Sequence, residues 1–384
     1  IKYCRAETAM AHGQRLTDFL ALLLVNLTIT LLLLEGSLQY VKIYGPNSQN
    51  PLVSSLNNYI ALDISWEEYF VYQYMDRGEM IYAGIHRYHP TRGWAMKPSV
   101  SNTGPDGISY TTNAQGYRAL QNYSDQPDQF QVMVVGDSFT FGDDITDTDT
   151  WPYLLQKRNQ SLNVIAIPGT GYGTDQMLVT LQEEIDKYHP DLVIAAYIGD
   201  NLHRSTLPFR DYKKPYFVLD DGKLVLHNIP VGPPAEVLAE ISQKHYFSYS
   251  PVQTVNLFNY FTNKLTRMDG EPSCGTRCTE LNTAIFEKMS ELASQHNAKF
   301  MLIYLPFYNE ITSPDGYQFG ESFFDLYRAS HQGEFLNPRT DLVEATFEKA
   351  PLHYRRNETS LLADLVMAKI RKMPSWQCKA KKHC

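Results

Sequence analysis

The feature that most constrains this chain is a short apolar run that ends in a serine. Residues 132–135 read VMVV, and Gly136-Asp137-Ser138 follows at once. Such a run is typical of a buried parallel strand. In an open α/β sheet, ligands bind beyond the carboxyl ends of the strands. The pattern therefore predicts that Ser138 lies in the ligand-binding site. Taken alone, Asp137 and Ser138 fit equally well as caps of the next helix.

Beyond this serine, helical and strand patterns alternate regularly. Helices are expected over residues 150–158, 176–188, 283–296 and 359–372, and strands over 163–167, 191–197 and 299–305, the last taken as the final strand of the sheet. Alternation of this kind predicts right-handed crossovers and a parallel sheet with helices on both faces. We therefore expect a three-layer α/β fold in which Ser138, Gly171 and Asn201 follow three successive strands at one edge of the sheet.

Composition is that of a globular protein without an affinity for nucleic acid. Of 384 residues, 43% are hydrophobic and 20% are charged, which is enough for an ordinary packed core. The formal net charge is -8, and no basic block of the kind that follows a phosphate backbone is present. A nucleic-acid partner is therefore not expected.

The N-terminal part of the chain predicts a membrane anchor. Residues 16–34 form an apolar segment close to the ~20 residues that span a bilayer. Basic residues precede this segment and Glu35 follows it, which predicts a cytoplasmic tail over residues 1–15 and an extracytoplasmic body, in a periplasmic, lumenal or extracellular space. A cleaved signal peptide is the main alternative. We favour the uncleaved anchor, because the run is long for a signal peptide and Glu35-Gly36-Ser37 is a poor cleavage site.

Cysteine positions agree with an exported body. Cys4 precedes the anchor, whereas Cys274, Cys278, Cys378 and Cys384 follow it in two pairs. In an oxidising compartment four cysteines can form two bridges, either within each pair or between the pairs. A zinc site is disfavoured, because neither pair has the tight CxxC spacing.

Three sequence blocks in order resemble the SGNH, or GDSL, hydrolase family. GDSFTFG surrounds Ser138, PGTGYGTD surrounds Gly171, and GDNL surrounds Asn201. The resemblance implies a flavodoxin-like SGNH hydrolase domain over residues 131–384, with an insertion at about 207–278. The preceding residues, 35–130, are expected to form a structural collar of short strands and loops.

The resemblance also implies a catalytic arrangement. Ser138 would be the nucleophile and His353 its base, since a serine hydroxyl is a poor nucleophile until a base takes its proton. Gly171 and Asn201 would donate hydrogen bonds to the negative charge of the tetrahedral intermediate, beside the N–H of Ser138. Taken singly, Asn201 also fits a turn residue at a strand end, and Gly171 a glycine that opens a helix.

Two positions depart from the family pattern. The family has an aspartate three residues before the histidine, and this chain has Ala350. The family usually has an aspartate after the asparagine, where this chain has Leu202, although the preceding Asp200 partly substitutes. The sequence leaves the orienting group open among Asp341, Glu344, Glu348 and a backbone carbonyl. A weak dyad or an inactive site is also possible, and His203 is the rival base.

The insertion at about 207–278 follows the strand that precedes Asn201. It predicts a β-hairpin turning at residues 220–222 and then a helical stretch with an aromatic cluster at Tyr246, Phe247 and Tyr249. Loops in this place usually shape specificity. These aromatic side chains could stack on the rings of a bound sugar or pack the insertion against the rest of the protein. We favour packing.

These observations predict a membrane-anchored, exported serine ester hydrolase. Its substrate would be an acyl ester, such as an acetyl ester, of an extracellular glycan. No metal or organic cofactor is implied. Two alternatives remain: an O-acyltransferase that uses the same acyl-serine, and a non-catalytic glycan-binding or assembly protein on the same fold.

Overall fold

The computed structural model divides into two compact units. It describes residues 2–44, 66–77, 85–104, 107–248, 275–312, 319–344 and 352–380. One unit comprises Ile1–Glu68 and Glu240–Glu271, and the other comprises Tyr69–Ala239 and Pro272–Cys384. The second unit holds the sheet and all predicted site residues, so it is called the catalytic unit below.

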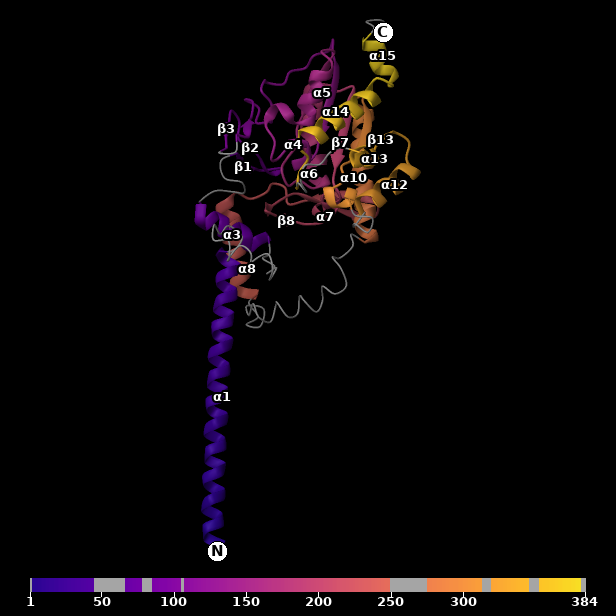
Figure 1. The fold of residues 1–384 in the computed structure, drawn as a ribbon. Coiled ribbons are helices and arrows are strands. Elements are labelled where there is room, and N and C mark those ends of the chain that lie inside the picture. Colours follow the sequence, from indigo (N-terminus) through magenta and orange to yellow (C-terminus); the bar gives the residue numbers. More distant parts are fainter. Residues whose placement is uncertain are drawn as a thin grey trace. The chain divides into compact units, whose positions relative to one another are not determined.

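A five-stranded parallel sheet forms the centre of the catalytic unit (Figure 1). The strands are β5 (Phe130–Val135), β6 (Leu162–Ala166), β7 (Leu192–Tyr197), β12 (Lys299–Tyr304) and β13 (Glu334–Leu336). Their order across the sheet is β13-β12-β7-β5-β6. Numbered along the chain this is 2-1-3-4-5, the flavodoxin-like order, so the predicted fold class is confirmed.

One expectation about the sheet is wrong. We expected β12 to be the last strand, but β13 pairs with it in parallel and adds an edge. With three residues, β13 is too short to show the apolar run or alternation from which a strand is recognised in sequence.

Alternate residues of the strands face two separate helical layers. Val132 and Val134 of β5 pack in a cluster with α5 (Trp151–Arg158) and α14 (Arg356–Ile370). Met133 and Val135 pack in a second cluster with α6 (Thr174–Tyr188) and α10 (Thr276–Gln295). Both faces of the sheet are therefore covered, which explains why its strands read as continuous apolar runs.

Short elements surround this three-layer core. The collar contains α3 (Trp66–Arg77) and two antiparallel pairs, β1 (His86–His89) with β2 (Gly93–Met96) and β3 (Ser101–Thr103) with β4 (Ser109–Thr111). The insertion contains β8 (Phe209–Arg210), β9 (Tyr212–Lys213), β10 (Tyr216–Asp220), β11 (Lys223–His227) and α8 (Pro234–Ser248). The remaining elements are α4 (Ser138–Phe141), η2 (Asp147–Asp149), α7 (Gly199–Arg204), α11 (Tyr308–Thr312), α12 (Phe319–Ser330), α13 (Arg339–Glu344) and α15 (Pro374–Ala380).

The predicted hairpin of the insertion is confirmed. Strands β10 and β11 pair antiparallel from Tyr216 opposite His227 to Asp220 opposite Lys223. Asp221 and Gly222 form the turn, both with positive φ. The aromatic cluster at 246–249 lies outside the described side chains.

The N-terminal helix α1 (Lys2–Tyr44) contains one apolar stretch of membrane-spanning length, Thr17–Leu38. This stretch is four residues longer at its end than the predicted anchor. Asn26, Thr28 and Thr30 interrupt it, and each side chain donates to the helix carbonyl four residues back, at 2.8–2.9 Å. Polar groups satisfied within their own helix are compatible with a lipid environment.

Two of the paired cysteines lie in described parts of the catalytic unit. Cys278 and Cys378 are both disulfide-bonded. Cys274 and Cys384 lie outside the described residues. The connectivity of the bridges therefore stays a prediction.

Candidate active site

The tight end of strand β5 delivers Ser138 to the carboxyl edge of the sheet. A Cβ atom on Gly136 would lie 2.2 Å from the Thr140 hydroxyl and 3.1 Å from the Ala196 carbonyl of β7, so only glycine fits there. Asp137 then caps α4 by accepting from the Phe139 N–H at 3.0 Å. Ser138 begins this short helix and is 5% exposed.

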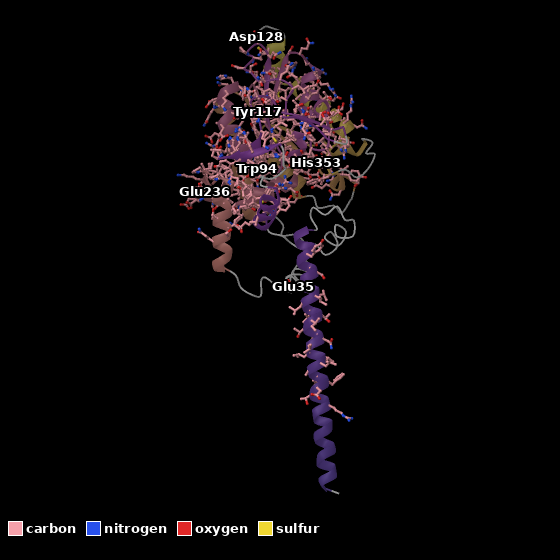
Figure 2. All side chains as sticks on the ribbon, turned by 90° about the vertical axis from the view of Figure 1, so that its left-hand side faces the viewer. Glu35, Trp94, Tyr117, Asp128, Glu236 and His353 are labelled. Atoms are coloured by element: carbon pink, nitrogen blue, oxygen red, sulfur yellow. The ribbon has the colours of Figure 1, made fainter. Side chains whose placement is uncertain are left out.

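His353, labelled in Figure 2, lies in the segment before α14 and contacts Ser138. Its Nε2 lies 3.0 Å from the Ser138 Oγ. The imidazole also packs against the Phe139 ring, with centroids 5.1 Å apart, which holds it over the nucleophile. His203, the rival base, is an exposed residue of α7. The structure therefore places side by side the serine and the histidine that the sequence resemblance assigns as nucleophile and base.

Asp144 occupies the place of the missing acid. Its Oδ2 lies 3.0 Å from the His353 Nδ1. Among the described residues, Asp144 makes this contact, and neither Asp341 nor a backbone carbonyl does. The side chains of Glu344 and Glu348, which the sequence also left open, lie outside the described part of the chain. Because Asp144 follows Ser138 by only six residues, a search near the histidine could not find it. The signal was present in the two consecutive aspartates that end GDSFTFGDD.

Arg118 holds the loop that carries Asp144. Its guanidinium donates to the carbonyls of Phe141, Gly142 and Ile145, and to the Asp147 carboxylate at 2.8 Å. Asp144 itself has a φ of 66°, in the left-handed region that non-glycine residues seldom adopt. The loop therefore depends on a buried arginine of the collar for the conformation that aims Asp144 at His353.

We expect Arg118→Lys to lower kcat by about 100-fold with little change in KM. A lysine retains the charge, but its single nitrogen cannot serve this set of acceptors, and a displacement of about 1 Å at a reacting group costs this much. Arg92→Lys is the matched control, since Arg92 is also a buried collar arginine but pairs with Glu183 and Glu184. Equal losses in both variants, measured with a small ester, would show that Arg118 acts through stability alone.

Asn201 ties the ends of three strands together. Its Nδ2 donates to the Asp137 Oδ2 at 2.9 Å and to the Tyr172 carbonyl at 2.7 Å, while its Oδ1 accepts from the Ile198 N–H at 2.7 Å. Arg204 adds an ion pair to Asp137 at 3.3 Å. Both N–H groups of this fully buried amide are thus engaged, so Asn201 serves as an oxyanion donor only if it gives up one of these bonds.

Two backbone N–H groups of the predicted oxyanion site are available to donate hydrogen bonds to a negative charge. Within the described part of the chain, neither the Ser138 N–H nor the Gly171 N–H donates to an acceptor. Gly171 has a φ of 79°, and a Cβ there would lie 2.3 Å from the Arg210 Nη1. Arg210, which is ion-paired with Asp211, comes from the insertion. The insertion therefore brings a cation to the predicted oxyanion site.

A second carboxylate lies beside the Ser138–His353 pair. The Thr170 hydroxyl is 3.5 Å from the Asp143 Oδ1. Burial raises the pKa of Asp143 to about 6, against the opposing effects of His353 and Arg118. In the folded protein this carboxyl therefore holds its proton to a higher pH than an ordinary aspartate does.

We expect Asp143→Asn to stabilise the protein near pH 7.5 and to have little effect near pH 4. A raised carboxyl pKa contributes stability below its unfolded value, and that contribution is lost as the pH rises through about 6. The amide imitates the protonated form at every pH, so it avoids the loss. Thermal melts of both proteins from pH 4 to pH 8 measure this difference, and a constant difference in Tm would contradict the assignment.

The sheet has the strand order of the α/β fold that the sequence resemblance predicts, and the site has the order of contacts of a serine nucleophile with a base and an acid. A serine, a histidine and an aspartate form a chain of contacts at the carboxyl edge, where β5 and β7 meet and the strand order reverses. Among the residues that the structure describes, no group of histidine, cysteine, aspartate or glutamate side chains is arranged to hold a metal.

Comparisons with known proteins find similar solved structures at low identity. A member of the lipolytic protein G-D-S-L family from Veillonella parvula is 11% identical (TM-score 0.37), over 63% of this chain and 99% of that chain. The psychrotrophic esterase EstA from a Pseudoalteromonas species is 14% identical (0.35), over 64% and 98%. A family two carbohydrate esterase from Clostridium thermocellum, in complex with cellohexaose, is 12% identical (0.35), over 65% and 66%. No family model and no curated protein matches.

Proposed function

We propose that this chain is a membrane-anchored serine ester hydrolase that removes acyl groups, such as acetyl, from an extracellular glycan. The observation that carries the proposal is the pair of 3.0 Å contacts that join Ser138 to His353 and His353 to Asp144. Ester hydrolysis through an acyl-serine requires this order of nucleophile, base and orienting acid. The glycan substrate rests on the family resemblance and on the predicted export.

The reaction would proceed in two halves. The Ser138 Oγ attacks the carbonyl carbon of the ester while the His353 Nε2 takes the hydroxyl proton, and Asp144 stabilises the resulting imidazolium. The N–H groups of Ser138 and Gly171 donate hydrogen bonds to the oxyanion of the tetrahedral intermediate. Collapse of the intermediate expels the sugar alkoxide, which takes the proton from His353, and leaves an acyl-serine. Water, deprotonated by His353, then releases the acid and restores the serine.

An acyltransferase would use the same acyl-serine and differ only in the acceptor. A sugar hydroxyl would replace water in the second half-reaction. The non-catalytic alternative was motivated by Ala350 and Leu202, and Asp144 now supplies the carboxylate that is missing at position 350. The catalytic proposal is therefore the better supported.

Labelling and turnover together test the proposed activity. The full-length protein in detergent should react with a fluorophosphonate probe at Ser138 and release p-nitrophenol from p-nitrophenyl acetate. Hydrolysis predicts that acetate appears in equal amount with or without an added oligosaccharide. Transfer predicts that an acetylated oligosaccharide appears instead. Absence of both labelling and turnover would contradict the esterase proposal and favour the non-catalytic binding role.

We further propose that Thr17–Leu38 spans the membrane with the catalytic unit outside. Basic residues lie before this stretch and Glu35 lies near its end, which is the charge distribution of a cytoplasmic N-terminus. Protease added to intact cells should then digest the catalytic unit and spare a fragment of anchor length. Protection of the catalytic unit until the membrane is opened would contradict this orientation.

A further inference from the structure

A cavity of about 370 Å³ lies at the opposite end of α6 from the candidate active site. Gly171 and Gly173 immediately precede this helix, which begins at Thr174, whereas Glu184 and Tyr188 of the cavity wall lie near its end. At a rise of 1.5 Å per residue, these two residues are roughly 15 and 21 Å further along the helix axis. The cavity is therefore separate from the site around Ser138.

Positive charge exceeds negative charge at this cavity, although the whole chain is acidic. The buried Arg92 pairs with Glu183 at 2.5 Å and with Glu184 at 2.7 Å. Lys187 also pairs with Glu184, at 2.9 Å. With Arg87, three cations thus meet two carboxylates, and one positive charge has no counterpart in the group.

Arg87, which lines the cavity, supplies this charge. It is exposed, and its Nε donates to the Met96 carbonyl at 3.1 Å. Within the described part of the chain, its terminal nitrogens have no acceptor. A guanidinium held at Nε presents its other two nitrogens as a fork, which is the geometry that binds a carboxylate through two parallel hydrogen bonds.

The rest of the wall suits a sugar ring. Tyr117, labelled in Figure 2, and Tyr188 line the cavity, and aromatic side chains of this kind offer an apolar face beside a hydroxyl group. At ~30 Å³ per water the volume corresponds to about twelve waters. A carboxylated sugar unit has about a dozen heavy atoms, and because bonded atoms are more closely spaced than waters, such a unit needs less than this volume. The cavity therefore has room for one such unit.

We propose that this cavity binds a carboxylate-bearing sugar unit of an acidic glycan, with Arg87 and Lys187 contacting the carboxylate. The link to catalysis rests on the proposed function: a chain bound here and running along α6 would reach the start of this helix, on the side of Ser138, ~15–20 Å from the bound unit. The substrate would then be a polymer of acidic sugars, held by one unit and deacylated at another.

Binding of a hexasaccharide of galacturonic acid tests the proposal. The probe is titrated calorimetrically against the full-length Ser138→Ala protein, in which turnover cannot interfere. We expect binding that weakens by about tenfold or more in Arg87→Gln and in Lys187→Gln, since each substitution removes a hydrogen bond to a charged group. Arg328→Gln on α12 is the matched control, because the side chains of Arg328 and Lys187 are both 57% exposed. It should bind as the parent protein does.

Two further measurements separate the possible outcomes. A neutral cellohexaose should bind at least tenfold more weakly than the acidic hexasaccharide, and turnover of p-nitrophenyl acetate should be unchanged by Arg87→Gln or Lys187→Gln. Equal affinity for both saccharides, equal binding by all variants, or equal affinity for inorganic phosphate would overturn the proposed site. Because binding is measured without Ser138, failure of the esterase proposal leaves this test intact.

Discussion

Ser138→Ala should abolish acyl-enzyme formation while leaving the fold intact. The hydroxyl contributes little to the core, and among the described residues beside His353 no other nucleophilic side chain contacts the base. Loss of the nucleophile in a serine triad lowers turnover by a factor on the order of 10⁶. Fluorophosphonate labelling followed by mass spectrometry, together with initial rates on p-nitrophenyl acetate, measures the effect.

His353→Ala is the informative partner of this variant. Members of a nucleophile–base unit act together, so its loss should be similar in size, and the double variant should be no worse than either single one. His203→Ala serves as the control, because it replaces an exposed histidine of α7. Full activity in His353→Ala with none in His203→Ala would reverse the assignment of the base.

Asp144→Asn should lower kcat by about 10⁴-fold without unfolding the protein. An amide at this position no longer favours the tautomer in which the His353 Nδ1 carries the proton and the Nε2 is free to accept one from Ser138. The size of the effect is that of the corresponding substitution in a serine protease triad, where the geometry survives and the tautomer is wrong. Initial rates of the purified variant measure the loss of kcat, and its circular dichroism spectrum shows whether the fold is retained.

Asp341→Asn is the control for this assignment. Asp341 lies on α13 and was one of the acids that the sequence left open. Its amide variant should keep the parent rate, because Asp144 is the carboxylate in contact with the His353 Nδ1. The assignment fails if Asp144→Asn keeps at least a tenth of the activity or if Asp341→Asn loses as much.

The order of elements and the nucleophile were readable in the sequence because their signals are local. The apolar run 132–135 is buried on both faces, as its lack of alternation predicted, and the turn after it is short because only glycine fits at position 136. The regular spacing of strands and helices restricted the fold to a parallel sheet with crossovers. These features depend on periodicity and turn chemistry, and each is contained in about ten residues.

The pairings between distant parts of the chain were decided by the tertiary structure. Asp144 is the acid because a loop after α4 bends back, with a positive φ and a collar arginine inside it, until it meets a histidine that lies 209 residues further along the chain. Asn201 was assigned by its position after a strand, but its side chain is engaged by Asp137 and Tyr172, which only the packing of three strand ends shows.

By itself, the sequence determined the fold class, the strand-end serine and the histidine that it pairs with, since short patterns encode where strands end. The folded chain was needed to show which carboxylate orients the histidine, which N–H groups have no acceptor among the described residues, and that a basic cavity lies at the far end of α6. The physical reason is that hydrogen-bond partners and charge balance are set by distances in space. Crossover connections bring residues into contact that are far apart in the sequence. Their positions in the sequence do not show that they will meet.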